Sequence, residues 1–315
     1  PSLSPEDPFA DFESFPYYLK PGVPAYSPEE GDFVRSALRT GLSIEQKTGI
    51  NPYQFGLIGS TDSHTGLATA EEGNFWGKMA TDALPENKAD SSGHIEKLGW
   101  TMSASGLAAV WAEENTRQSI FDAFQRKEVY ATTGPRIAVR VFAGTEFQPG
   151  DENTLDIAEV RAKGVPMGGE LSALDEAPSF LIHAAKDPKS ASLDRVQMVK
   201  GWLKGSETFE RVYDVAWSGE RQVDAAAQVT PVPNTVNPET GQYSNEHGSA
   251  TLSALWADPD FNSEEPAFYY VRVLEVPTPR HSTLDAIALG IDPAETGQAM
   301  SLQERAYTSP IHYRP

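Results

Sequence analysis

Hydrophobic positions recur at helical spacing in two stretches of the first 135 residues. Apolar side chains three and four positions apart in residues 33–42 predict a helix that ends near Gly49. Ser27-Pro28-Glu29-Glu30 has the residue order of a capping box, so we expect this helix to start there, with Gly31 weakening its first turn. A second helix is predicted over residues 115–127, where the apolar side chains again share one face.

Between these helices, the pattern predicts one buried strand and one long excursion. Phe55-Gly56-Leu57-Ile58-Gly59 is short, apolar on both faces and flanked by turn-forming residues, as is typical of a buried parallel strand. Residues 66–105 are rich in Gly, Ser, Asp and Glu. A stretch of this kind inside a compact domain is usually functional or mobile.

The hydrophobic period changes to two after Arg136, where Ile137, Val139 and Val141 alternate with other residues. Such alternation predicts strands. Further strand-like segments, separated by turn residues, are residues 180–186, 195–203, 211–217, 250–256 and 267–276. Together they predict a β-sandwich, which begins between residues 136 and 150. The last stretch predicts one short helix, residues 284–289, and a closing strand.

Composition and charge narrow the possible partners. The chain has 315 residues, with 25 Lys and Arg against 45 Asp and Glu, which gives a formal net charge of −20. A charge of that sign disfavours nucleic acid and anionic membrane surfaces as partners. Cysteine is absent, which excludes disulfides, cysteine-ligated zinc and a thiol nucleophile. We expect no membrane span, because no apolar run reaches the length that one needs.

The sharpest candidate for chemistry is Asp62-Ser63-His64, directly after the predicted buried strand. A carboxylate oxygen and an imidazole nitrogen two residues apart can converge on one Zn, Mn or Fe ion if the backbone turns between them. The end of a parallel strand is also where α/β folds place catalytic groups. The alternative is that Asp62 caps a turn and His64 is simply packed or exposed.

Two further residues are candidates for substrate binding. Arg136, held by the turn Gly134-Pro135, could bind an oxyanion through its guanidinium group, or could simply start an edge strand in solvent. His94 lies in the long excursion, where it could cover a site or be solvated. Arg280-His281, after Pro277-Thr278-Pro279, predicts a surface turn. Phosphate-loop, dinucleotide-binding, nucleophile-elbow and H-E-x-x-H motifs are absent from the sequence.

Several long motifs, in one order along the chain, resemble the DUF3604 family. They are residues 55–66, Ala109-Val110-Trp111-Ala112-Glu113-Glu114-Asn115-Thr116-Arg117, residues 130–137, Lys163-Gly164-Val165-Pro166-Met167-Gly168-Gly169, residues 197–202, residues 212–218 and residues 268–280. The resemblance covers essentially the whole chain. That family in turn is similar to the PHP metal-dependent hydrolases, which have a distorted α/β barrel of the amidohydrolase type.

The resemblance implies a fold, a cofactor and a site. The implied fold is α/β: residues 1–140 form the C-terminal part of a PHP-like barrel, and residues 141–315 form a β-sandwich domain. The implied cofactors are divalent ions, Zn, Mn or Fe, with Asp62 and His64 matching the last ligand motif of the family. Asp62 could also take a proton from a metal-activated water, and Arg136 and His94 would contact the substrate.

The resemblance also implies a function and a missing part. It implies hydrolysis of a small-molecule ester. A phosphoester is the leading substrate class, and sulfate ester and carbamate are alternatives. The H-x-H pair and the middle ligand motifs of the family do not occur here, so we expect this chain to be a C-terminal half whose N-terminal half lies elsewhere. A periplasmic or secreted location is expected. The competing hypothesis is a non-catalytic module that binds a glycan or a protein through Trp202, Trp217 or Trp256.

Overall fold

The strands of this protein form two main sheets, which we describe from a computed structural model. It describes residues 4–15, 17–18, 20–23, 26–27, 29–67, 71–92, 95–104, 106–154, 156–224 and 228–315. Within these residues the larger sheet has eight strands, β1 (Leu107–Val110), β2 (Val129–Thr132), β5 (Glu170–Ser172), β7 (Leu193–Lys204), β8 (Glu207–Trp217), β10 (Ala267–Glu275), β13 (Arg305–Thr308) and β14 (Ile311–Arg314). The smaller sheet contains β3 (Ala138–Gly144), β4 (Val165–Pro166), β6 (Ser179–Ala185) and β9 (Thr251–Ala257). A short pair joins β11 (Thr278–Pro279) to β12 (Ser301–Leu302).

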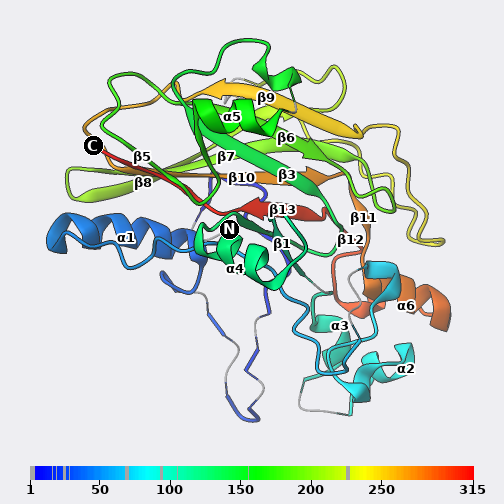
Figure 1. The fold of residues 1–315 in the computed structure, drawn as a ribbon. Helices are drawn as coiled ribbons and strands as arrows, with labels where there is room; N and C mark the ends of the chain where they lie inside the picture. Colours follow the sequence, from blue (N-terminus) through cyan, green and yellow to red (C-terminus); the bar gives the residue numbers. More distant parts are fainter. Residues whose placement is uncertain are drawn as a thin grey trace.

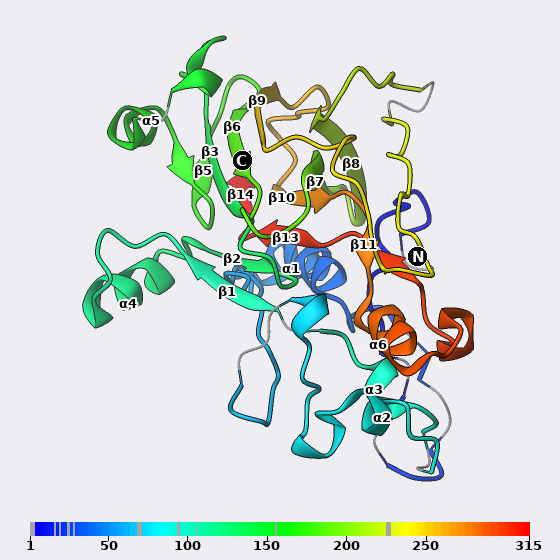
Figure 2. The same ribbon diagram turned by 90° about the vertical axis from the view of Figure 1, so that its right-hand side faces the viewer.

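Helices are few and lie outside the sheets (Figure 1). They are α1 (Val34–Thr48), α2 (Pro85–Lys88), α3 (Leu98–Thr101), α4 (Arg117–Gln125), α5 (Ile157–Lys163) and α6 (His281–Leu289), with single 3-10 turns η1 (Glu72–Asn74), η2 (Ala80–Asp82), η3 (Asp151–Asn153) and η4 (Pro293–Thr296). Helices α2, α3 and α6 gather away from the sheets (Figure 2). Across the part of the chain that the structure describes, no helix is both long and apolar enough to cross a membrane.

Strand β10 is the centre of the larger sheet and explains how the core forms. One edge pairs with β7, and the other edge is shared by β14 and β13. Its odd-numbered side chains, such as Tyr269 and Val271, pack against the smaller sheet, where Val141 and Ile182 contribute to the same cluster. Its even-numbered side chains face the other way. Because both faces are covered, every residue of β10 is buried.

Helix α1 covers the outer face of the larger sheet (Figure 1). Leu38 and Leu42, one turn apart, pack with Phe268 and Tyr270 of β10. The polar face of the helix is tied to β8, since Arg35 and Arg39 both form ion pairs with Glu210. The sheet therefore lies between the smaller sheet on one side and a helix on the other.

The N-terminal segment makes two turns, at residues 5–6 and 8–9, and is held by buried arginines. We call residues 4–15 the N-terminal strap. Asp7 accepts hydrogen bonds from Arg272 and Arg35, and Glu13 accepts two from Arg280. Arg272 and Arg280 are almost fully buried. Burial alone would raise the pKa of Asp7, but the guanidinium groups of Arg272 and Arg35 lower it to about 2.

Most of the predicted strands and helices are confirmed, and the exceptions have physical reasons. The predicted strands after residue 136 correspond to β3 and β6–β10, and the two later helices correspond to α4 and α6. The predicted start of the first helix is wrong: it begins at Val34, because Asp32 accepts a hydrogen bond from the Glu29 backbone and closes a separate turn. Pro28 lies outside the described residues.

The predicted buried strand over residues 55–59 is also wrong. This described segment is extended but has no strand ladder, and the Ile58 side chain is exposed. The Leu57 amide donates to the Ser309 hydroxyl instead of to a neighbouring strand. A Cβ at Gly59 would lie 2.6 Å from the Leu107 carbonyl oxygen, so the segment passes close against the backbone of β1 at that point.

The architecture is mixed α/β with mostly antiparallel sheets. The two main sheets share one hydrophobic core, as a β-sandwich requires. The PHP-like barrel and the division at residue 140 stay predictions. Hydrogen bonding continues across residue 140, since β2 pairs with both β1 and β13.

Candidate functional site

The Asp62-Ser63-His64 turn lies beside a cavity of about 320 Å³, which we call the polar cavity because its walls include the charged residues Glu13, Asp62, Glu72 and Lys78. Asp62 lines this cavity and has a positive φ of 50°. Its carboxylate Oδ1 lies 3.9 Å from His64 Nε2, and both side chains are well exposed. The structure therefore brings the two predicted metal ligands close together, with their polar atoms free to meet a ligand.

Local hydrogen bonds explain why the chain turns here. The Ser63 amide donates to the Thr61 hydroxyl, and the Asp62 amide donates more weakly to the Ser60 hydroxyl. Such side-chain contacts with the backbone two residues on are typical of turns. The His64 amide donates to the Lys78 carbonyl oxygen at 2.7 Å, which joins the turn to the long excursion.

Carboxylates from distant parts of the chain form other walls of this cavity. Glu13 reaches it from the N-terminal strap, and Glu72 reaches it from η1. Burial raises the pKa of Glu72, although His281 opposes this and its backbone amide donates to the carboxylate. The cavity therefore has three carboxylates in its walls, from Glu13, Asp62 and Glu72.

A further buried carboxylate, Glu304, lies behind Thr133 in the wall of this cavity. Thr133 lines the cavity and donates through its hydroxyl to Glu304. Glu304 is buried, and burial together with the charge of Glu72 raises its pKa well above the usual value. The two carboxyl groups thus interact across the wall.

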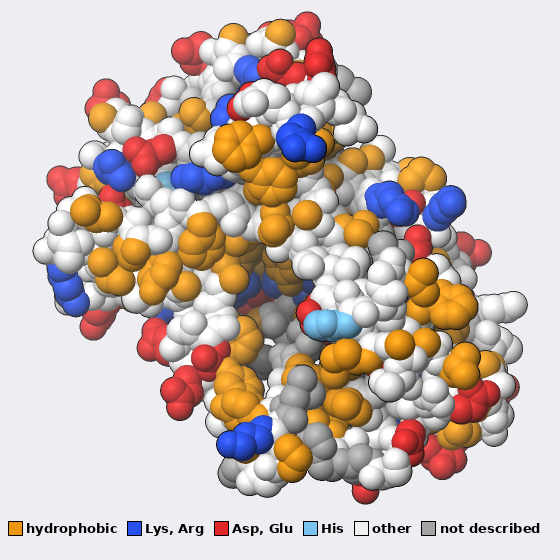
Figure 3. Space-filling model, turned by 60° about the horizontal axis from the view of Figure 1, so that its bottom comes forward, with side chains coloured by type: hydrophobic (Ala, Val, Ile, Leu, Met, Phe, Trp, Pro, Cys, Tyr) orange, Lys and Arg blue, Asp and Glu red, His pale blue; other side chains and the backbone are white. Residues whose placement is uncertain are grey.

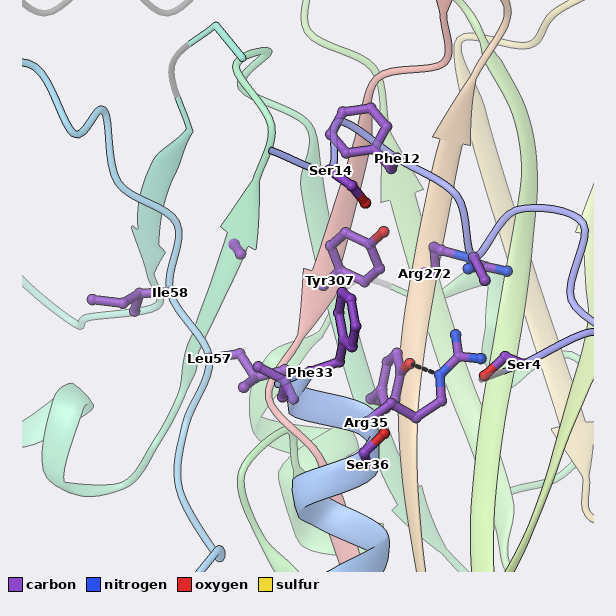
Figure 4. Close-up of a pocket in the computed structure, with 14 residues that line it drawn as sticks. Ser4, Phe12, Ser14, Phe33, Arg35, Ser36, Leu57, Ile58, Arg272 and Tyr307 are labelled. Atoms are coloured by element: carbon purple, nitrogen blue, oxygen red, sulfur yellow. Dashed lines mark hydrogen bonds between the residues drawn. The ribbon is translucent and has the colours of Figure 1, made fainter. Parts of the chain in front are cut away.

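An apolar chamber of about 370 Å³ adjoins the polar cavity. The two share Phe12, Ala131 and Tyr307 as wall residues. Phe12, Tyr307 and Phe33 follow one another along the chamber, with Arg35 and Arg272 to one side (Figure 4). On this face of the molecule, hydrophobic side chains gather around a hollow that has a histidine and an acidic side chain at its rim (Figure 3).

The remaining predicted site residues are placed differently. The Arg136 backbone amide donates to Asp187, and its side chain lies at the surface, 3.5 Å from Glu71. It is not among the described residues that line the cavity, so its role in substrate binding stays a prediction. His94 lies outside the described residues.

The two metal ligands stay a prediction as well. Among the described residues, no three His, Cys, Asp or Glu side chains gather closely enough to hold a metal ion. Asp62 and His64 provide a carboxylate oxygen and an imidazole nitrogen, which suit Zn, Mn or Fe. The donor types fit such an ion, and Asp62 and His64 would be two of its ligands.

The tryptophans predicted for a binding module do not form an exposed patch. Trp202, Trp217 and Trp256 are all partly buried. Trp202 stacks on Phe209 at 5.6 Å between ring centroids, and Trp256 packs against Tyr213. The binding-module hypothesis stays a prediction.

The sequence did not single out several residues around the cavity. Lys78 and Glu72 lie in the excursion of residues 66–105, whose length and composition were the available signal. Arg280 and His281, predicted to lie in a surface turn, are buried. That prediction is wrong because Arg280 pairs with Glu13 of the strap, and His281 Nε2 lies 2.8 Å from the Met102 carbonyl oxygen.

Comparisons with known proteins give one match. No curated protein and no solved structure matches the chain. A family model described as "Protein of unknown function (DUF3604)" matches residues 1–315. Because this match covers the whole chain, the protein belongs to the DUF3604 family.

Proposed function

We propose that this protein provides part of the active site of a metal-dependent hydrolase that acts on a small-molecule ester, with a phosphoester as the leading substrate class. The observation that supports this most is the Asp62–His64 pair beside a cavity that Glu13 and Glu72 also line. In this proposal residues 1–140 are part of a PHP-like barrel, and residues 141–315 form a β-sandwich. Sulfate esters and carbamates are alternative substrates on the same scaffold.

Asp62 and His64 have one task in common, and Asp62 has a second. Asp62 and His64 would hold a divalent ion, Zn, Mn or Fe. Such an ion, when bound, lowers the pKa of a water and polarises the bond to be cleaved. Asp62 accepts a proton during the reaction, for which its exposed carboxylate is accessible. The apolar chamber next to the cavity excludes water from one side of the substrate.

The remaining metal ligands have to come from another part of the protein. Catalytic zinc sites use three protein ligands, whereas the described residues supply two. We propose that the N-terminal half implied by the family resemblance supplies them, either in the same polypeptide or as a second chain. The apolar chamber, which adjoins the cavity that Asp62 lines, offers such a segment a surface to pack on. Figure 3 shows hydrophobic side chains around a hollow on one face of the molecule.

Metal content tests this proposal directly. Purified protein, first checked for a co-purifying polypeptide, is analysed by elemental mass spectrometry as wild type, Asp62→Asn and Asp11→Asn. We expect near-stoichiometric Zn, Mn or Fe in the wild type, loss of it in Asp62→Asn, and retention in Asp11→Asn, which removes the same charge from an exposed side chain. A metal-free wild type that contains both halves would refute the proposal.

A further inference from the structure

The cavity beside Asp62 contains a cation that the proposed function does not yet use. Three carboxylates line this cavity: Glu13, Asp62 and Glu72. Among the described residues that line it, Lys78 is the only one with a positively charged side chain. Its exposed fraction is 6%, so the protein holds this ammonium group largely away from bulk water.

Backbone contacts fix Lys78 against the Asp62 turn on two sides. Its Nζ donates to the Thr61 carbonyl oxygen at 2.7 Å and makes a longer contact of 3.5 Å with the Ala104 carbonyl oxygen. Its own carbonyl oxygen accepts the hydrogen bond from the His64 amide. The ammonium group is therefore placed next to the residue before Asp62 and cannot move far without disturbing the turn.

The charge of Lys78 is incompletely compensated. Its hydrogen-bond partners are neutral carbonyl groups, and no described carboxylate lies within ion-pair distance of its Nζ. Burial lowers the pKa of Lys78, and the charges of Asp62, Asp82 and Glu72 oppose that shift from farther away. The Phe75 ring, whose centroid lies 5.8 Å from this Nζ, is uncharged as well. A buried ammonium without a carboxylate partner gains free energy from an anion that enters the cavity.

The chemistry of an ammonium group then indicates the kind of anion. Lysine carries three donors on a compact charge and binds phosphate groups as a point charge. Two of these donors are directed at the carbonyl groups of Thr61 and Ala104, which leaves a third for a ligand.

We propose that Lys78 is the oxyanion-binding residue of this cavity, and that the cavity takes a ligand with a tetrahedral oxyanion of the phosphate or sulfate type. This inference rests on the proposed function, because it assigns the charged end of the substrate to the cavity that contains Asp62. It replaces neither metal ligand. It adds a residue from the long excursion, which sequence analysis connected with a substrate only through His94.

The test measures the binding of inorganic phosphate by isothermal titration calorimetry, with the purified protein in its metal-containing form and after treatment with a chelator. The variants are Lys78→Met, Lys78→Arg and, as a control, Lys189→Met. Lys189 is exposed and lies in the turn after β6, far along the chain from the cavity. All variants are first compared by circular dichroism and by their unfolding midpoints.

We expect Lys78→Met to weaken phosphate binding by roughly tenfold or more, as for a lost hydrogen bond to a charged group. Lys78→Arg keeps affinity within a few-fold, and Lys189→Met leaves it unchanged. A folded Lys78→Met protein that binds phosphate as the wild type does would overturn the inference, and so would a wild type that binds no phosphate. If Lys78→Met does not fold, the test is instead the NMR chemical shift of the Lys78 Cε group in the wild type, measured before and after phosphate is added. A shift on phosphate addition supports the inference, and an unchanged signal overturns it.

These outcomes separate the inference from the proposed function. Metal retention without Lys78-dependent phosphate binding refutes the role of Lys78 and leaves the hydrolase proposal in place. Lys78-dependent phosphate binding in a protein that contains both halves and holds no metal supports an anion site while refuting the hydrolase proposal.

Discussion

Replacing Asp7 should loosen the N-terminal strap and cost a large part of the stability of the fold. The Asp7 side chain is 2% exposed and accepts hydrogen bonds of 2.7 and 3.0 Å from Arg272 and one of 2.8 Å from Arg35. Asp7→Asn removes the negative charge and leaves the Arg272 guanidinium, which is 1% exposed, without its counter-ion. Breaking a buried ion pair in this way costs about 3–5 kcal/mol.

The pH dependence of the free energy of unfolding gives a second, independent measure of what Asp7 contributes. The pKa of Asp7 is about 2 in the folded protein, against an ordinary value of 3.8. Because the folded state lowers the pKa of an acid, its stabilisation is complete above pH 3.8 and is lost as the pH falls through 2. Between pH 5 and pH 2 this amounts to about 2 kcal/mol, at about 1.4 kcal/mol for each pKa unit.

Urea denaturation measures both quantities. Wild type, Asp7→Asn and Glu6→Gln are compared at pH 7, and wild type and Asp7→Asn are compared again between pH 5 and pH 2. Glu6 is the adjacent residue and is exposed, so its substitution removes the same charge without breaking a buried pair. The reasoning is refuted if Asp7→Asn costs no more than Glu6→Gln, or if the gap between wild type and Asp7→Asn stays constant as the pH falls.

Two further predictions concern the sheets. Gly201→Ala should destabilise the protein by about 1–3 kcal/mol in thermal unfolding, because a Cβ there would lie 2.3 Å from the Phe268 ring. As a control, Gly73→Ala should be close to neutral, because its Cβ would meet nothing within 3.4 Å. Equal effects of the two substitutions would contradict the packing argument. Burial raises the pKa of Glu275 from 4.5 to about 8 in the folded protein. Between these two pH values the unfolded chain loses the proton and the folded protein keeps it, so a rising pH favours unfolding. The free energy of unfolding should therefore fall by about 4 kcal/mol between pH 4.5 and pH 8 because of this group. In Glu275→Gln, which keeps an acceptor for the Ser190 hydroxyl, that part of the pH dependence should vanish from urea titrations; an unchanged slope would show that Glu275 is ionised in the fold.

The strands of the sandwich-like part could be predicted because the alternation of apolar and other residues within each strand shows which of its faces is buried. The alternation of Val139 and Val141 shows which side of β3 meets the core, and no distant residue is needed to see it. The same argument failed for residues 55–59. Their apolar character suits a strand, but a strand also needs a partner with free hydrogen-bonding groups, and the Leu57 amide has the Ser309 side chain instead.

The candidate site could be predicted only where its residues are neighbours in sequence. Asp62 and His64 form a local pattern, and the structure places their polar atoms 3.9 Å apart. Glu13 and Lys78 reach the same cavity from other segments, and nothing in their immediate sequence indicates where those segments lie. The burial of Arg280 was missed for the same reason, since its partner Glu13 is 267 residues away.

The separation between the N-terminal strap and its arginines also determines when the strap can take its place. Asp7 and Arg272 are 265 residues apart along the chain. Closing so long a loop is entropically costly until the strands between them have formed. We therefore expect the strap to dock after β10 has joined the sheet. Strap residues line both cavities, so both are complete only once this long-range contact has formed.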